Sequence, residues 1–171
     1  MGPISIGDEA PNFDLSSTED ALLMLRDEVS QVSVVLYFFA DPESDRTRRD
    51  LEALNQHLPE LKKLRARVLA VSPVKLEDLK KLQAERKLLF PLLHDDRGFS
   101  AHYGVTAEEG KAPAPALVVV SRKQRILWLT NPVAAVDGAL PEVQKLLKGQ
   151  PSPTASYPRS IVNRLIDRWV N

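Results

Sequence analysis

Apolar residues in the first half of the chain form two continuous runs with a periodic segment between them. Residues 32–39, VSVVLYFF, and residues 67–72, RVLAVS, are largely apolar or β-branched over the length of a strand. Such runs are typical of strands that are covered on both faces. Between them, leucines recur every three or four positions, as on the buried face of a helix: Leu51, Leu54, Leu58, Leu61 and Leu64. This order predicts a βαβ unit.

The predicted helix has a recognisable start and an interruption. Ser44 or Asp45 supplies the kind of side-chain oxygen that caps a helix N-terminus. Pro59 lacks a backbone N–H and clashes with the preceding turn of a helix. We therefore expect Pro59 to kink the helix or to split it in two.

The second half continues the alternation and ends in a hairpin and a helix. Residues 76–87 carry leucines with helical spacing. Residues 116–120, ALVVV, and 126–130, ILWLT, flank a short polar connection, which predicts a hairpin. A last helix is expected at about residues 137–148. The chain is predicted to be an α/β protein whose central mixed sheet has helices on both faces, with residues 1–148 as one domain.

The C-terminal residues have a different pattern. Residues 149–158, GQPSPTASYP, are rich in Pro and Ser and predict a linker or a strap. Residues 159–171 predict an amphipathic helix. This helix either packs on its own domain or docks on a second subunit or a protein partner. The apolar side chains that would make such a contact include Ile161, Leu165 and Trp169.

Composition narrows the classes of function. Lys plus Arg and Asp plus Glu balance at 23 each, so no general field draws the protein to nucleic acid or anionic lipid. No segment approaches the ~20 apolar residues of a membrane span, and the N-terminus lacks a signal-peptide pattern. We therefore expect a cytoplasmic protein. The chain has no cysteine, which excludes disulfides, iron–sulfur clusters and thiolate zinc sites.

Three segments carry a family resemblance. Residues 6–15, IGDEAPNFDL, residues 68–105 and residues 115–127, PALVVVSRKQRIL, resemble parts of the peroxiredoxin and thiol-specific antioxidant superfamily in the same order and spacing. The resemblance covers about residues 4–148. It implies the thioredoxin fold, a three-layer α/β/α sandwich with a central mixed sheet, to which residues 159–171 would add a C-terminal helical extension.

The active-site turn of that family falls on residues 37–51, YFFADPESDRTRRDL. Family members carry a Pro, a Thr or Ser, and the peroxide-reacting Cys at positions that are Ala40, Ser44 and Thr47 here. Relatives with a thioredoxin-like CxxC resemble the same stretch, and their two cysteines fall on Ser44 and Thr47. Both alignments give Thr47 the place of the nucleophile.

Two further family positions lie before the late hairpin. The family's activating Arg falls near Ala114 and Pro115, where this chain has no arginine. Pro115 lies where thioredoxin-like members place a cis-proline beside the active site, so the resemblance implies a cis Ala114–Pro115 bond.

Loss of the sulfur removes the family's reaction. Peroxide reduction needs a thiolate whose pKa is lowered by its surroundings, and it passes through a sulfenic acid. The hydroxyl of Thr47 neither ionises near neutral pH nor forms such an intermediate. Acyl transfer from Ser44 or Thr47 would need a nearby base, and the three histidines, His57, His94 and His102, lie in no triad motif. We expect Ala40, Ser44 and Thr47 to be vestigial and no residue to be catalytic.

A binding site is the remaining candidate in this turn. A helix N-terminus has unpaired N–H groups and a positive dipole end, and so attracts anions. The opposing interpretation is a solvated, salt-bridged helix start, because four acidic residues lie among the three arginines. The candidate binding residues are Ser44, Arg46, Thr47, Arg49 and Pro115.

No metal or cofactor is predicted, because Asp95, Asp96 and Gly98 suit a turn better than a metal site. The favoured function is a non-catalytic binding or interaction module, either as a homodimer or with a protein partner. The alternative is an oxidoreductase that uses a non-thiol cofactor or a partner's cysteine. A third interpretation is engineered removal of cysteines, which suits Ser44 but not Thr47.

Overall fold

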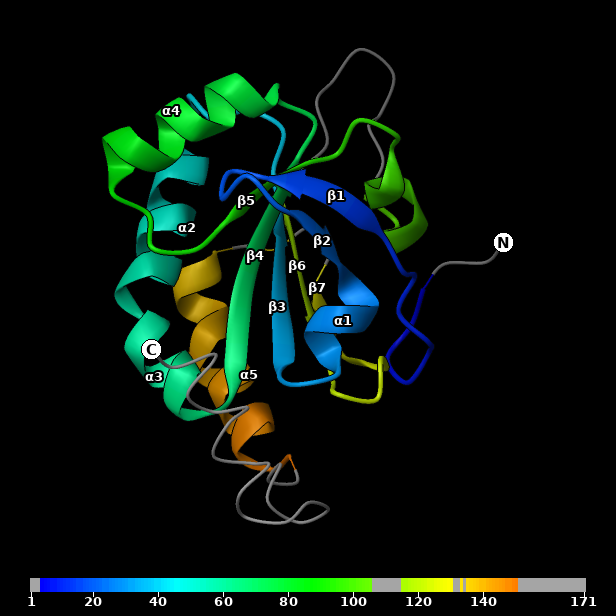
Figure 1. Cartoon of the computed structure of the whole chain (residues 1–171). Coiled ribbons are helices and arrows are strands. Elements are labelled where there is room, and N and C mark those ends of the chain that lie inside the picture. Colours follow the sequence, from blue (N-terminus) through cyan, green and yellow to red (C-terminus); the bar gives the residue numbers. More distant parts are fainter. Residues whose placement is uncertain (1–3, 106–114, 131–132, 134, 151–171) are drawn as a thin grey trace, which may run out of the picture.

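The computed structural model describes residues 4–105, 115–130, 133 and 135–150. One seven-stranded sheet has the order β2-β1-β5-β4-β3-β6-β7 (Figure 1). Its strands are β1 (Asp14–Ser17), β2 (Leu22–Met24), β3 (Ser33–Phe38), β4 (Ala66–Ser72), β5 (Leu92–His94), β6 (Ala116–Val120) and β7 (Ile126–Thr130). The helices are α1 (Leu25–Val29), α2 (Asp45–Gln56), α3 (Leu58–Lys63), α4 (Leu76–Arg86), the 3₁₀ helix η1 (Phe99–Tyr103) and α5 (Val136–Lys148).

The sheet is mixed, as the sequence predicts. Strand β3 pairs in parallel with β4 and antiparallel with β6. All six residues of β3 are buried, because this strand has neighbours on both edges and helices on both faces. The predicted hairpin at 116–130 is confirmed as the antiparallel pair β6–β7.

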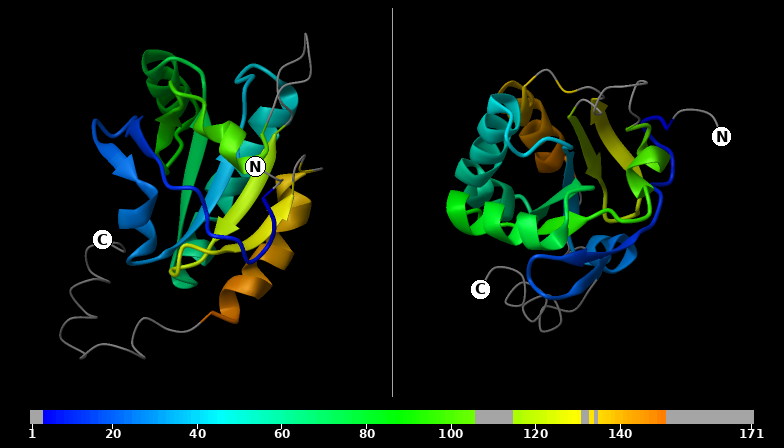
Figure 2. Two further views of the ribbon diagram at one scale, coloured as in Figure 1. Left: turned by 90° about the vertical axis from the view of Figure 1, so that its right-hand side faces the viewer. Right: turned by 90° about the horizontal axis from the view of Figure 1, so that it is seen from above.

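Helices and loops cover the two faces of the sheet in separate layers. Helices α2, α3, α4 and α5 pack their leucines and valines on one face. Helix α1, residues 10–15 and η1 pack on the other, as the end-on view in Figure 2 shows. The predicted α/β/α arrangement is therefore confirmed.

The long leucine-rich helix is split at the expected place. Helix α2 ends at Gln56, His57 lies between the helices, and Pro59 lies in the first turn of α3. Proline is tolerated there because the N–H groups of a first turn have no partner within the helix. Ser44, and not Asp45, is the N-cap of α2.

The N-terminal hairpin β1–β2 and helix α1 were not predicted from the sequence. Their elements have four, three and five residues, too few for a hydrophobic period to be recognised. Tertiary contacts hold them, since β1 pairs with β5 and Arg67 Nη1 donates to Glu28 Oε2 of α1 at 2.7 Å.

The predicted C-terminal helix at 159–171 and nearly all of the linker at 149–158 lie outside the described residues. They remain predictions. Within the part of the chain that the structure describes, no helix is both long enough and apolar enough to cross a membrane.

Candidate functional site

The start of α2 lies at the end of the sheet where β3 finishes. Strand β3 ends at Phe38 and α2 begins at Asp45. Phe38 pairs with Ala116, the first residue of β6, so Pro115 lies at the same end of the sheet. The Pro115 carbonyl accepts a hydrogen bond from the Val133 N–H at 2.9 Å. The Ala114–Pro115 bond lies outside the described residues, so its predicted cis form stays a prediction.

Ser44 and Thr47 are hydrogen-bonded to each other. The Thr47 N–H donates to Ser44 Oγ at 3.0 Å, which is the helix cap. Ser44 Oγ lies 2.9 Å from Thr47 Oγ1, to which it donates. Thr47 is only 1% exposed. The residue in the expected nucleophile position is therefore buried, with both of its polar groups in local hydrogen bonds.

Asp50 lies one turn further along α2 and connects three elements. The Tyr37 hydroxyl of β3 donates to Asp50 Oδ2 at 2.8 Å. Arg46 Nε donates to the same oxygen at 3.1 Å. The Val136 N–H, in the first turn of α5, donates to Asp50 Oδ1 at 3.1 Å. Both oxygens of this buried carboxylate therefore have partners, as a buried charge requires.

The phenol of Tyr37 stays neutral in this setting. Burial raises its pKa well above the usual range, and the negative charge of Asp50 and the hydrogen bond to it act in the same direction. Thr47 and Arg46 oppose this shift more weakly. A neutral phenol is a hydrogen-bond donor to Asp50, and it cannot serve as a base near neutral pH.

The three arginines of the turn have different surroundings. Arg46 is directed to Asp50, and its Nη2 is buried with no hydrogen-bond partner among the described residues. Arg48 Nη1 lies 3.7 Å from an oxygen of the exposed Asp45. Arg49 is exposed and has no ion pair within the described part of the chain. The salt-bridged helix start is thus found for Arg46 and Arg48.

The predicted site residues are brought together only in part. Ser44 and Thr47 touch, Arg46 lies between them in the sequence and turns to Asp50, and Arg49 faces solvent. Sequence reasoning missed the buried roles of Tyr37 and Asp50. A signal was present, because a tyrosine inside a fully buried strand needs a partner for its hydroxyl.

The other candidate groups have local partners. A ring nitrogen of His94 lies 2.8 Å from the Val74 carbonyl oxygen, and His57 Nε2 lies 3.7 Å from Asp137. The Asp95 carboxylate accepts from the N–H groups of Phe99 and Ser100 and so caps η1. Among the described residues, no three metal-ligating side chains lie close enough to share an ion.

Comparisons with known proteins agree with this architecture. The AhpC/TSA family model matches residues 6–129. The peroxidoxin BcpB of Mycobacterium tuberculosis superposes with a TM-score of 0.79 at 21% identity, covering 87% of this chain and 99% of that one.

Two further structures are similar. A cysteine-to-serine mutant of PrxQ from Xylella fastidiosa has a TM-score of 0.78 at 23% identity, over 86% of this chain and 98% of its own. Thioredoxin peroxidase I of Plasmodium yoelii has a TM-score of 0.71 at 16% identity, over 91% of this chain and 99% of its own. At these identities the likeness shows the fold alone. No curated protein gave a significant match.

Proposed function

We propose that this chain, which belongs to the AhpC/TSA family, lacks the family's thiol chemistry and acts as a binding or interaction module. The family match spans well over half of the chain, and the three structural neighbours named above have a peroxiredoxin-like fold. The sequence of 171 residues contains no cysteine. A peroxiredoxin fold is thus present without the atom that reacts with peroxide in that family.

The observation that carries the proposal is the state of Thr47. Its hydroxyl replaces the expected thiol, and it is buried and paired with Ser44. Peroxide reduction oxidises a thiolate to a sulfenic acid and releases water or an alcohol. A threonine hydroxyl offers neither the anion nor the oxidisable atom. The polar groups of the turn instead stabilise the junction of β3, α2 and α5.

Peroxide consumption with excess thiol reductant tests the loss of activity. We expect the natural protein to match a no-protein control, with a chelator present to remove metal-driven background. A Thr47→Cys variant measures whether the pocket still activates a thiol, and Ser44→Cys is its matched control one helical turn earlier. Turnover by the natural protein would overturn the proposal and favour an oxidoreductase that uses a non-thiol cofactor or a partner's cysteine.

Anion binding at the start of α2 is a second candidate role. It is favoured by Arg46 Nη2, a buried donor without a partner among the described residues, beside a helix N-terminus. A thermal-shift screen with small anions should show stabilisation that is reduced in Arg46→Ala. An equal response in Arg46→Ala and in the natural protein would exclude this role.

The interaction role has its own candidate surface, the predicted C-terminal helix. Its apolar positions Ile161, Leu165 and Trp169 lie outside the described residues. Sedimentation of the full chain should show a homodimer, or capture should yield a protein partner, that is lost when residues 159–171 are deleted. An unchanged mass and an unchanged set of captured proteins in the deletion variant would contradict this assignment.

A further inference from the structure

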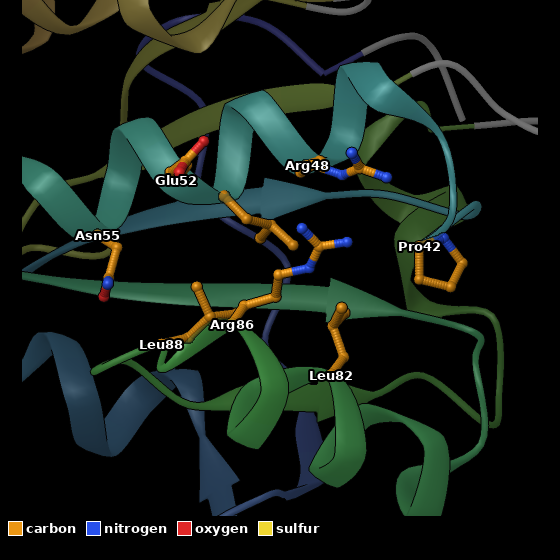
Figure 3. Close-up of a pocket in the computed structure, with 8 residues that line it drawn as sticks. Pro42, Arg48, Glu52, Asn55, Leu82, Arg86 and Leu88 are labelled. Carbon is orange, nitrogen blue, oxygen red and sulfur yellow. The ribbon is translucent and has the colours of Figure 1, made fainter.

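Helices α2 and α4 enclose a small groove that neither Ser44 nor Thr47 lines. Figure 3 shows side chains from both helices directed into the space between them. The cavity has a volume of about 50 Å³. Its lining residues are Pro42, Arg48, Leu51, Glu52, Asn55, Leu82, Arg86 and Leu88.

The lining of the groove combines three leucines with two arginines and one acidic residue, Glu52. Leu51, Leu82 and Leu88 are all buried and supply the apolar wall. Arg48 enters from α2 and Arg86 enters from the last turn of α4. An apolar wall with a few converging polar groups is the usual composition of a small-molecule site.

Charge in the groove is incompletely balanced. Arg86 is partly buried and has no ion pair or side-chain hydrogen bond with another described residue. Arg48 is 45% exposed, and its described ion pair, with Asp45, is long at 3.7 Å. In Figure 3 the Arg86 side chain extends from α4 toward α2, whereas the carboxylate of Glu52 points away from it. Two guanidinium groups at one cavity repel each other unless an anion lies between them.

Hydrogen bonds of Asn55 connect the two sides of the groove. Asn55 Oδ1 accepts from the Leu89 N–H at 2.8 Å, and Asn55 Nδ2 donates to the Lys87 carbonyl at 3.1 Å. The Asn55 amide therefore joins α2 to the segment that follows α4. Such cross-linking restricts the movement of α2 relative to the segment after α4, and preorganisation of this kind lowers the entropic cost of binding.

The volume limits the size of a ligand. One water needs roughly 10–15 Å³ of such space, so this cavity of about 50 Å³ holds a group of about four non-hydrogen atoms. Cofactors and drug-sized ligands occupy about 300–1,000 Å³ and do not fit. A guanidinium group matches a carboxylate through two parallel hydrogen bonds.

We propose that the α2–α4 groove binds a short-chain carboxylate of about two or three carbons. The carboxylate lies between Arg48 and Arg86, and the alkyl end contacts Leu51, Leu82 and Leu88. This inference goes beyond the proposed function, because the groove is separate from Thr47 and would bind the acid whether or not the chain reduces peroxide.

Titration with propionate, followed by the NMR shifts of the leucine methyl groups, tests this site. We expect saturable shifts at Leu51, Leu82 and Leu88. Arg86→Gln and Arg48→Gln should each weaken binding by about tenfold or more, the effect of losing a charged hydrogen bond. The matched control is Arg49→Gln, which removes the same charge from the same helix but does not line the groove. It should bind as the natural protein does.

Two further compounds test the charge and the alkyl end of the ligand separately. Propionamide has the shape of propionate without its charge, and it should bind at least about tenfold more weakly. Inorganic phosphate pairs with guanidinium groups as a carboxylate does but has no alkyl end, so it should leave the leucine methyl groups unshifted.

Several results would overturn the inference. These are no saturable shift with propionate, equal binding of propionamide, leucine methyl shifts with phosphate equal to those with propionate, or an equal loss in Arg49→Gln, which would indicate only general surface charge. Loss of binding in Arg46→Ala with retention in Arg86→Gln would move the site to the start of α2. None of these outcomes depends on peroxide turnover.

Discussion

Helix α2 presents polar residues to two neighbours, and the two sets are satisfied differently. Toward β3 and α5, Thr47 and Asp50 are buried, and both oxygens of the Asp50 carboxylate have donors. Toward α4, Arg48 and Arg86 line a cavity, and Arg86 has no ion pair within the described residues. Thr47, Arg48 and Asp50 lie on α2 within about one turn of each other, whereas Arg86 comes from the last turn of α4.

The difference indicates which polar groups of this region stabilise the fold and which are available to bind a ligand. A polar group whose hydrogen bonds are all made inside the fold contributes to stability and has nothing left to offer a ligand. A partly buried cation without a partner is costly in the free protein, and it gains the most when an anion binds. The polar groups of Thr47, at the position that family resemblance marks as reactive, have local hydrogen-bond partners, whereas Arg86, on the side facing α4, has no ion pair among the described residues.

The largest effect is expected from Asp50→Ala. The substitution leaves Tyr37 Oη, Arg46 Nε and the Val136 N–H without their acceptor. We expect the free energy of unfolding to fall by about 3 kcal/mol, measured by urea denaturation. Asp45→Ala removes an exposed carboxylate of α2 and should cost less than about 0.5 kcal/mol. Similar losses of unfolding free energy in Asp50→Ala and Asp45→Ala would show that the hydrogen bonds of Asp50 contribute no special stability.

The next effect is a dependence on alkaline pH. The folded pKa of Tyr37 is raised above its unfolded value of 10.0, so the native state keeps a proton that the unfolded chain releases. Its stabilisation is complete below pH 10 and is lost as the pH rises above that value, by about 1.4 kcal/mol per pH unit. Unfolding of Tyr37→Phe should therefore depend less steeply on pH by that amount.

Tyr103→Phe provides a reference for this measurement, because burial alone raises the pKa of Tyr103. It should reduce the slope similarly. Of the two tyrosines, Tyr37 donates a hydrogen bond to Asp50, whereas the pKa of Tyr103 is raised by burial alone. An unchanged slope in Tyr37→Phe would mean that the phenol ionises within the folded protein.

A smaller effect is expected at the cap of α2. Ser44→Ala removes the acceptor for the Thr47 N–H and the contact with Thr47 Oγ1. We expect a loss of about 1 kcal/mol. Because the two hydroxyls are partners, Thr47→Val should cost less in the Ser44→Ala background than alone. Additive losses in this double-mutant cycle would show that the pair is not coupled.

The smallest effect is expected in the groove. Arg86→Gln removes a charge that has no ion pair among the described residues, so stability should change by less than about 0.5 kcal/mol. Urea denaturation without added anions provides the measurement. A loss above 1 kcal/mol would assign Arg86 a structural role and remove the contrast between the two sides of α2.

Much of the fold was predictable because its central elements are long or strongly patterned. The segment Val34–Phe38 belongs to a continuous apolar run of strand length. The leucines of α2 and α3 keep the spacing of a helix over several turns. The hairpin β1–β2 and helix α1 have no such signal; β1 is held by its pairing with β5 and α1 by the contact of Glu28 with Arg67. A cap at Ser44 or Asp45 followed from local chemistry, and the structure selects Ser44. The groove, by contrast, required α4 to lie beside α2.

The sequence by itself determined the order of the main elements, an interruption of the helix at Pro59, the family, and the absence of a thiol, because each is local or depends on which atoms are present. Only the tertiary structure decided which polar groups have partners. Asp50 and Arg86 are 36 positions apart in the chain. Neither position in the sequence indicates that Asp50 is surrounded by hydrogen-bond donors, or that Arg86 has no ion pair among the described residues. Hydrogen bonding and charge compensation depend on distances in space, which the order of residues along the chain does not specify.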